Sequence, residues 1–236
     1  MQLTTENTGS FLRRRKRFMV DLKRDDGSEV TVHCPNTGAM TGCLQVDAKA
    51  YCSRATNPAR KYPLTLEWLE FESGHRACIN TMRPNAIVAE GIRNGVAEPL
   101  KNYTTMHSEC RYGRENSRID WLLQSTSKSI PDCYLEVKNV TLCEGENGYF
   151  PDAVSLRALK HLRELIWMRA QGYRAMVIFC VNHTAIRRLY PADKVQHDYG
   201  ELLRSAQYQG VELLAYRTDI QLDQISLMEE IPVLLD

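Results

Sequence analysis

Hydrophobic and polar residues alternate in short runs over the first third of the chain, which predicts β-strands. FLRRRKRFMVDLK (11–23) predicts one strand, RDDGS contains an Asp-Gly turn, and EVTVHC (29–34) alternates, so together they predict a hairpin. Three further strand candidates are AKAYCSR, LTLEWLEFE and HRACINT. This succession of strands without a helical pattern indicates a small closed β-barrel of the OB type, and a fragment of a β-sandwich is the alternative.

The pattern changes at Arg83-Pro84. Residues 84–94 are predicted to form a helix, with Pro at its start and Gly95 after its end. Further on, Asp152 and Gly172 bound the clearest helical pattern, 152–171. The remaining elements predicted are strands at MHSECRYG, SRIDWLLQ, CYLEVKNVTL, YRAMVIFCVN and VELLAYR, and a helix over DKVQHDYGELLRSAQYQG.

This order predicts an antiparallel meander followed by βαβ crossovers, which form a mixed sheet with helices packed on it. The chain is therefore expected to have a mixed α/β (α+β) fold in two domains, 1–82 and 83–236.

Composition limits the class of protein. The 236 residues are 43% hydrophobic and 25% charged, which is typical of a globular protein with a sizeable core. The net charge of +1 favours neither nucleic acid nor membrane by itself. The eight cysteines lack Cys-x-x-Cys spacing and are expected to be small buried residues. The polar start MQLTTENTGS and the shortness of the apolar runs predict a cytoplasmic protein without signal peptide or membrane partner.

Charged residues interrupt two apolar segments, RIDWLL and CYLEVKNV. Glu136 and Lys138 lie two apart in a predicted strand and so share a face, and Asp120 begins the strand before. An antiparallel register brings the two carboxylates together, where they repel unless a cation such as Mg²⁺ or Mn²⁺ lies between them. With Lys138 placed to orient a water, this set suits phosphodiester hydrolysis. The alternative is a structural salt bridge, Glu136–Lys138 or Asp120–Arg118.

At these residues the sequence resembles the sugar fermentation stimulation protein A (SfsA) family. The resemblance implies an N-terminal OB-like barrel, a C-terminal PD-(D/E)XK restriction-endonuclease-like domain, and DNA binding. It matches Asp120 to the first acid of the motif, Glu136 and Lys138 to its (D/E)-x-K, and Glu109 to an extra acid; Ile119 replaces the motif's proline. The segments that carry it are RKRF, HCPNTGAMTGC, KYP, RYGRENSRIDWLL, CYLEVKNVTL and FPDAVSLRALKHLREL.

Several residues are candidates for nucleic-acid contact. The basic run RRRKR (13–17) is expected to contact phosphates or to be a solvated edge strand, with alternate side chains on opposite faces. The loop PNTGAMTG offers backbone N–H groups to a phosphate or is a tight turn. The helix stripe containing His161 and Glu164 is either a solvated face or a flank of the site. The candidates are Arg13, Arg14, Lys16, Arg17, Asn36, Thr37, Arg157 and Lys160.

Three functions remain open from the sequence. The first is a DNA-binding protein, with RNA as an alternative ligand, whose Mg²⁺- or Mn²⁺-dependent site hydrolyses phosphodiesters with little sequence preference. The second is a non-catalytic DNA-binding regulator of sugar (maltose-type) metabolism. The third is an interaction module whose barrel binds protein or oligosaccharide.

Overall fold

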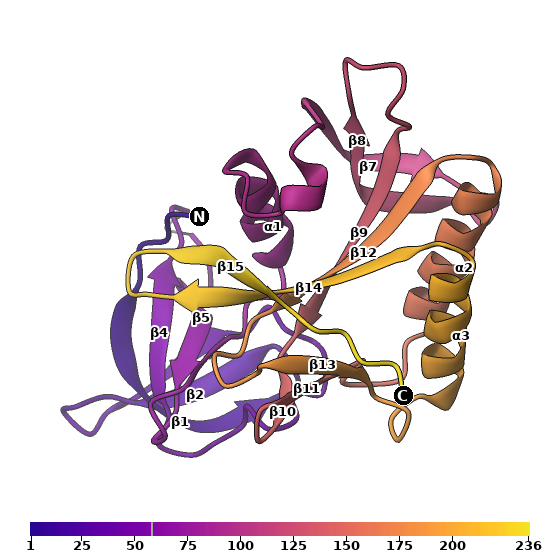
Figure 1. The fold of residues 1–236 in the computed structure, drawn as a ribbon. Helices are drawn as coiled ribbons and strands as arrows, with labels where there is room; N and C mark the ends of the chain where they lie inside the picture. Colours follow the sequence, from indigo (N-terminus) through magenta and orange to yellow (C-terminus); the bar gives the residue numbers. More distant parts are fainter. Residues whose placement is uncertain (58) are drawn as a thin grey trace.

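The computed structural model describes residues 1–57 and 59–236, which form a β-barrel packed against a mixed α/β unit (Figure 1). The barrel strands are β1 (Glu6–Arg15), β2 (Met19–Lys23), β3 (Glu29–His33), β4 (Lys49–Arg54), β5 (Leu64–Glu70) and β6 (Arg76–Cys78). Their order is β3-β2-β1-β4-β5-β6, and the additional pairing of β3 with β5 closes the barrel. The closed five-strand path β1-β2-β3-β5-β4 is that of the predicted OB fold.

The basic run differs from the predicted single strand. It forms the end of β1 and a turn over residues 16–18, so 11–23 is itself a hairpin of β1 and β2. Lys16 and Arg17 occupy the left-handed region, with φ of 49° and 62°. The predicted alternation of side chains therefore stops at Arg15.

The second unit is built on a six-stranded sheet of order β15-β14-β12-β9-β8-β7. The β9, β12 and β14 strands are parallel, while β7, β8 and β15 are antiparallel to their neighbours. These strands are β7 (Thr105–Tyr112), β8 (Ser117–Gln124), β9 (Cys133–Val140), β12 (Arg174–Val181), β14 (Glu212–Ile220) and β15 (Ile225–Ile231). The predicted meander and crossovers are confirmed, but β15 lies in a tail for which no strand was predicted.

Helices cover both faces of this sheet (Figure 1). On one face, α1 (Pro84–Arg93) packs Ile87, Val88 and Ile92 into the core. On the other, α2 (Leu156–Ala170) and α3 (His197–Tyr208) pack side by side. A short 3₁₀ helix, η1 (Glu98–Leu100), follows α1. No helix within residues 1–57 and 59–236 is both long and apolar enough to cross a membrane.

Two features of this unit differ from the sequence-based prediction. The N-cap of α2 is Ser155, whose Oγ accepts from the Ala158 N–H at 3.1 Å, rather than Asp152. A small sheet of order β10-β11-β13 was also not predicted. Its strands are β10 (Leu142–Glu144), β11 (Asn147–Phe150) and β13 (Arg188–Pro191), each too short to show a period.

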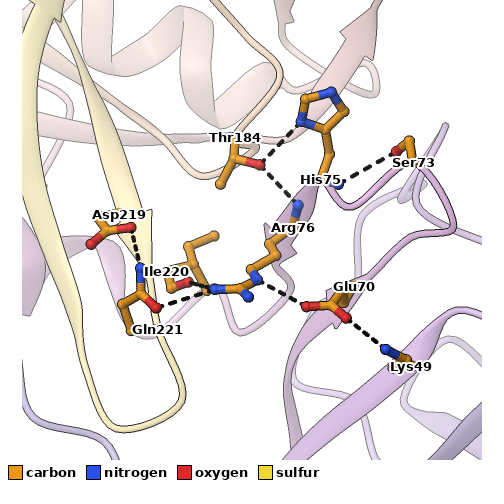
Figure 2. Close-up of polar contacts among 9 residues, drawn as sticks. All are labelled: Lys49, Glu70, Ser73, His75, Arg76, Thr184, Asp219, Ile220 and Gln221. Carbon is orange, nitrogen blue, oxygen red and sulfur yellow. Dashed lines mark hydrogen bonds and ion pairs between the residues drawn. The ribbon is translucent and has the colours of Figure 1, made fainter.

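Arg76 joins the barrel to the mixed sheet (Figure 2). Its guanidinium donates to Glu70 in the barrel at 3.0 Å and to the carbonyl of Ile220, at the end of β14, at 2.7 Å. Its backbone exchanges hydrogen bonds with Thr184: its N–H donates to Oγ1 at 2.9 Å, and its carbonyl accepts from the Thr184 N–H at 2.8 Å. Because Arg76 forms hydrogen bonds with both units, it stabilises the junction between them.

The hydrophobic core is also continuous across this junction. Leu3, Trp68 and Cys78 pack into the same cluster as α1 and the mixed sheet. Six of the eight cysteines are buried, as expected from their treatment as small apolar residues. The predicted domain boundary between residues 82 and 83 falls just before α1 and stays a prediction.

Candidate metal and nucleic-acid site

Three acidic residues lie in line across β7, β8 and β9. Ser108 pairs with Trp121 and Cys110 with Ile119, so Glu109 lies opposite Asp120. The last paired residue of β8 against β9 is Trp121, opposite Leu135, so Asp120 lies opposite Glu136 one step beyond. The backbone pairing of β8 with β9 therefore ends next to Asp120 and Glu136, and the Val137 N–H donates to the Asp120 carboxylate there.

The backbone is irregular at this point. Glu109 has a φ of +57°, which is unfavourable for a residue with a side chain. In β8, Ile119 packs in the core under α2, whereas Leu123, four residues later, packs in the core under α1. Because alternation in a regular strand would put both on one face, β8 turns between them, next to Asp120. Such irregularities often occur where a site re-aims side chains.

Asp120 is held by two donors. The Asn85 side-chain amide, on α1, donates to its Oδ1 at 2.8 Å, and the Val137 N–H donates to its Oδ2 at 2.8 Å. Burial and the nearby charge of Glu136 nevertheless raise the pKa of Asp120, although both hydrogen bonds oppose them. The pair of carboxylates is therefore short of positive charge.

The two oxygens of Glu136 have different surroundings. Oε1 accepts from Lys138 Nζ at 2.6 Å and from His161 Nδ1. Oε2 is buried and has no hydrogen-bond partner among the described residues. Burial acts to raise the pKa of Glu136, but the Lys138 ammonium and the His161 ring outweigh it and lower the pKa overall. Glu136 is thus held as a carboxylate with one oxygen free.

His161 of α2 orients Glu136. Arg157 Nε donates to its Nε2 at 3.3 Å, so the ring proton lies on Nδ1 and is donated to Glu136. Of the two alternatives for this helix stripe, the solvated face is wrong for His161 and Glu164, because they are only 4% and 2% exposed. A polar stripe at helical spacing has the same sequence pattern whether it faces water or a buried acid.

Glu164 fixes the turn between β7 and β8. Its carboxylate accepts from the backbone N–H groups of Arg114, at 2.8 Å, and Glu115. A Cβ on Gly113 would lie 2.0 Å from Glu164 Oε2, so only glycine permits this approach. The hairpin that carries Glu109 and Asp120 is therefore attached to α2.

Mg²⁺ or Mn²⁺ fits the residues present. Both ions prefer carboxylate oxygens, and the buried free oxygen of Glu136 lacks the partner that a buried polar atom normally has. Asp120 and Glu136 would hold the ion. The Glu136–Lys138 ion pair expected in the alternative interpretation is formed as well. Glu109 is exposed and lines a neighbouring pocket, and its assignment as a third ligand stays a prediction.

A different group of possible ligands lies on α3. His197, Asp198 and Glu201 have ligand atoms within 4.8 Å of one another, and all three residues are exposed. In the described ranges, no other group of three such residues is as close. Exposed clusters of this kind are common without an ion, so this group is not assigned as a metal site.

The basic residues of the run 13–17 include three with partners in the protein and two that are exposed. Arg13 and Arg15 pair with Asp21, and Arg14 donates to the carbonyls of Arg17, Asn36 and Gly38, at 2.8, 2.5 and 2.9 Å. Lys16 and Arg17, in the turn, are exposed. Arg14 therefore ties the basic turn to the loop around residue 38, which leaves Lys16 and Arg17 as the side chains open to a ligand.

That loop touches the second unit. Asn36 is buried, and its Oδ1 accepts from the Gly38 N–H at 2.8 Å, whereas Thr37 is exposed. A Cβ on Gly38 would lie 2.9 Å from Asp152 Oδ2, four residues before α2. The loop and Asp152 line a pocket of about 190 Å³ that also includes Asn139, next to Lys138. The basic turn, this loop and the start of α2 are thus contiguous.

The comparisons with known proteins agree with this architecture. Residues 12–79 match the family model described as the SfsA N-terminal OB domain. Residues 82–224 match the sugar fermentation stimulation protein RE domain. The sugar fermentation stimulation protein homolog of Hahella chejuensis (strain KCTC 2396) is 48% identical over 225 residues, which cover 95% of this chain and 93% of that protein.

A solved structure is similar over nearly its full length. The structure of Pyrococcus furiosus SfsA in complex with Ca²⁺ is 26% identical, with a TM-score of 0.86 over 99% of this chain and 98% of that one. The OB barrel and the restriction-endonuclease-like unit are therefore shared with a protein solved with a divalent cation. On these matches, the chain belongs to the SfsA family, with an OB domain followed by a restriction-endonuclease-like domain.

Proposed function

We propose that this protein binds nucleic acid through phosphates and hydrolyses phosphodiester bonds with Mg²⁺ or Mn²⁺ held by Asp120 and Glu136. One observation carries the proposal: a buried oxygen of Glu136 has no partner among the described residues, and Asp120 is hydrogen-bonded to the next residue, Val137, where the pairing of β8 with β9 ends. The Ca²⁺ complex of the relative from Pyrococcus furiosus supports a divalent ion in this family.

The residues around the ion would divide the remaining tasks. The bound ion would polarise a phosphoryl oxygen and acidify a water. Lys138, which is 12% exposed while Glu136 is 3% exposed, would also donate to a water or phosphate oxygen at the mouth of the site. Asn85 and the Val137 N–H keep Asp120 in place, and His161 does the same for Glu136.

Binding would use two basic surfaces on either side of this site. Lys16 and Arg17 extend from the barrel turn, and Arg157 and Lys160 line a pocket beside His161 on α2. The connection from Arg14 through Gly38 to Asp152 supports one continuous surface. Since these contacts reach phosphates, we expect little sequence selectivity, on DNA foremost and on RNA as the alternative.

The test is cleavage of labelled single- and double-stranded DNA and RNA with Mg²⁺, Mn²⁺ or EDTA. We expect metal-dependent products that are lost, by about a thousandfold or more, in Asp120→Ala and Lys138→Ala. Lys101→Ala is the matched control, because Lys101 is exposed and, among the described residues, forms an ion pair only with Glu98 in η1. Cleavage that persists in both site variants contradicts the assignment.

A second candidate is binding without catalysis. It is favoured by the completeness of the ion pair between Glu136 and Lys138, with His161 on the same oxygen, which needs no metal to balance the charge of Glu136. This function predicts nucleic-acid affinity that is equal with EDTA and Mn²⁺ and unchanged in Asp120→Ala, with no products from any substrate. It would suit a regulator of sugar metabolism.

A further inference from the structure

A pocket of about 520 Å³ lies between the β7–β8 hairpin and α2, beside the proposed metal site. We call it the hairpin pocket. Arg111, Arg118, Arg157 and Lys160 line it, together with Ser117 and Glu109. The lining contains four cationic side chains and one carboxylate, so it is strongly positive.

These cations are not neutralised by the protein. None of the four forms an ion pair with any residue that the structure describes, whereas Arg163, on the same helix, pairs with Glu115 at 2.7 Å. Within residues 1–57 and 59–236, Arg157 forms a hydrogen bond only through Nε, which donates to His161. The remaining guanidinium and ammonium donors are available to an anion.

The arrangement of two arginines is itself unfavourable without an anion. Arg111 and Arg118 are paired directly opposite each other across β7 and β8. Like charges in directly opposed positions destabilise a sheet. An anion between them would turn this repulsion into attraction, because each guanidinium can donate two parallel hydrogen bonds to phosphate oxygens.

Ser117 gives an independent indication of a ligand. It lines the hairpin pocket, is 3% exposed, and its Oγ has no hydrogen-bond partner among the described residues. A buried hydroxyl without a partner is unfavourable. A phosphate oxygen in the pocket would accept a hydrogen bond from this hydroxyl.

The hairpin pocket adjoins the proposed active site through one imidazole. His161 lines the pocket and donates to Glu136 from its other nitrogen. Phosphates along an uninterrupted strand would require cations spaced along a track. Here four cationic side chains line one pocket of about 520 Å³, which suits a phosphate monoester dianion.

We propose that the hairpin pocket binds the terminal phosphate monoester of a nucleic-acid strand and so directs the proposed hydrolysis to phosphorylated ends. This rests on the proposed function for its consequence, but the binding itself needs no metal. The same chemistry would accept a free phosphate or nucleotide, and the experiment separates these sources.

The test measures binding in EDTA, where no cleavage interferes. One fluorescent oligonucleotide is prepared with a 5′-phosphate, a 3′-phosphate or only hydroxyl ends, and its affinity is measured by anisotropy. We expect one phosphorylated form to bind about tenfold more tightly than the hydroxyl form. In Arg111→Ala/Arg118→Ala this preference should disappear, while the hydroxyl form keeps its affinity within about twofold.

Arg163→Ala is the control and should keep the preference, because Arg163 is exposed and paired outside the pocket. Ser117→Ala is a second variant that should fold normally and weaken only the phosphorylated form. Equal binding of all three oligonucleotides by the wild type, or a preference that survives the double substitution, overturns the proposal.

A further measurement with inorganic phosphate distinguishes binding of a free anion from binding of a phosphorylated strand end. If inorganic phosphate stabilises the wild type but not the double variant, and no oligonucleotide end is preferred, the pocket binds a free anion and the proposal fails. If the end preference is present but no substrate is cleaved with Mn²⁺, the inference stands and the proposed hydrolysis fails. If cleavage occurs without any end preference, the inference alone fails.

Discussion

Asp120→Asn should stabilise the metal-free protein while removing its proposed activity. The carboxylate accepts two hydrogen bonds at 2.8 Å, yet burial and the Glu136 charge still raise its pKa. Each unit of raised pKa corresponds to about 1.4 kcal/mol lost from the free energy of unfolding when the group is ionised. A neutral amide keeps an acceptor for the Val137 N–H, and Asn85 can turn its own amide to match.

We therefore expect the free energy of unfolding at neutral pH in EDTA to rise on the order of 1 kcal/mol, and Tm to rise by about 2–4 °C. Because the folded-state pKa is raised, the penalty in the wild type is complete above that pKa. It disappears as the pH falls through the folded-state pKa toward the unfolded value of about 3.9. The advantage of the variant should be largest at neutral pH and shrink on acidification.

We expect a bound divalent ion to reverse the order of stability of the wild type and Asp120→Asn. A divalent ion at about 100 times its Kd stabilises a binding protein by about 2.7 kcal/mol, and the variant should gain much less. The assay is urea unfolding from pH 4 to 8 with EDTA or Mn²⁺, with the exposed residue Asp223 changed to Asn as the matched control. A variant that is less stable than the wild type in EDTA at pH 7, or whose advantage grows on acidification, refutes the reasoning.

Three further changes test the surroundings of the site. Gly38→Ala would place a Cβ 2.9 Å from Asp152 Oδ2, an atom at the end of a side chain that can move, and should reduce the free energy of unfolding by only about 0.5–1 kcal/mol. Gly38→Ala/Asp152→Ala should recover this loss in urea unfolding, and no recovery would contradict the contact. Glu164→Ala removes two charge-assisted hydrogen bonds to the β7–β8 turn and should lower the free energy of unfolding by about 2–3 kcal/mol. It should also speed amide hydrogen exchange in that turn, and unchanged exchange would show that Glu164 does not hold the turn. Lys16→Ser/Arg17→Ser should leave the free energy of unfolding within about 0.5 kcal/mol of the wild type. It should reduce the slope of log affinity for DNA against log salt concentration by about 0.9 for each phosphate that the turn no longer neutralises. An unchanged slope would show that the turn does not contact DNA.

Much of the fold was predictable because local pattern and tertiary structure agree. Alternation marks the barrel strands, Pro84 and Gly95 bracket α1, and the apolar run 174–181 is a central parallel strand. The turn at Lys16 and Arg17 was not predictable, since it uses two residues other than glycine at positive φ. The β15 strand was missed because its own pattern is weak, and its pairing with β14 is a tertiary contact that the local sequence does not show.

The candidate site was predictable only in its charged centre. Glu136 and Lys138 stand out because charge is unfavourable inside a strand, and antiparallel pairing then brings Asp120 to them. The burial of His161 and Glu164 depends on how α2 packs on the sheet, which helical periodicity alone does not specify. Partners such as Asn85, from a helix 35 residues away in sequence, have no local sequence signal.

The central claim is that Asp120 and Glu136 share one hard divalent cation. Its most direct test is an anomalous difference map from a crystal of this protein soaked in Mn²⁺. We predict a peak about 2 Å from a carboxylate oxygen of each residue, on the Oε2 side of Glu136, that disappears in Asp120→Asn. A map with no peak there, or with manganese only at His197, Asp198 and Glu201 on α3, would contradict the claim.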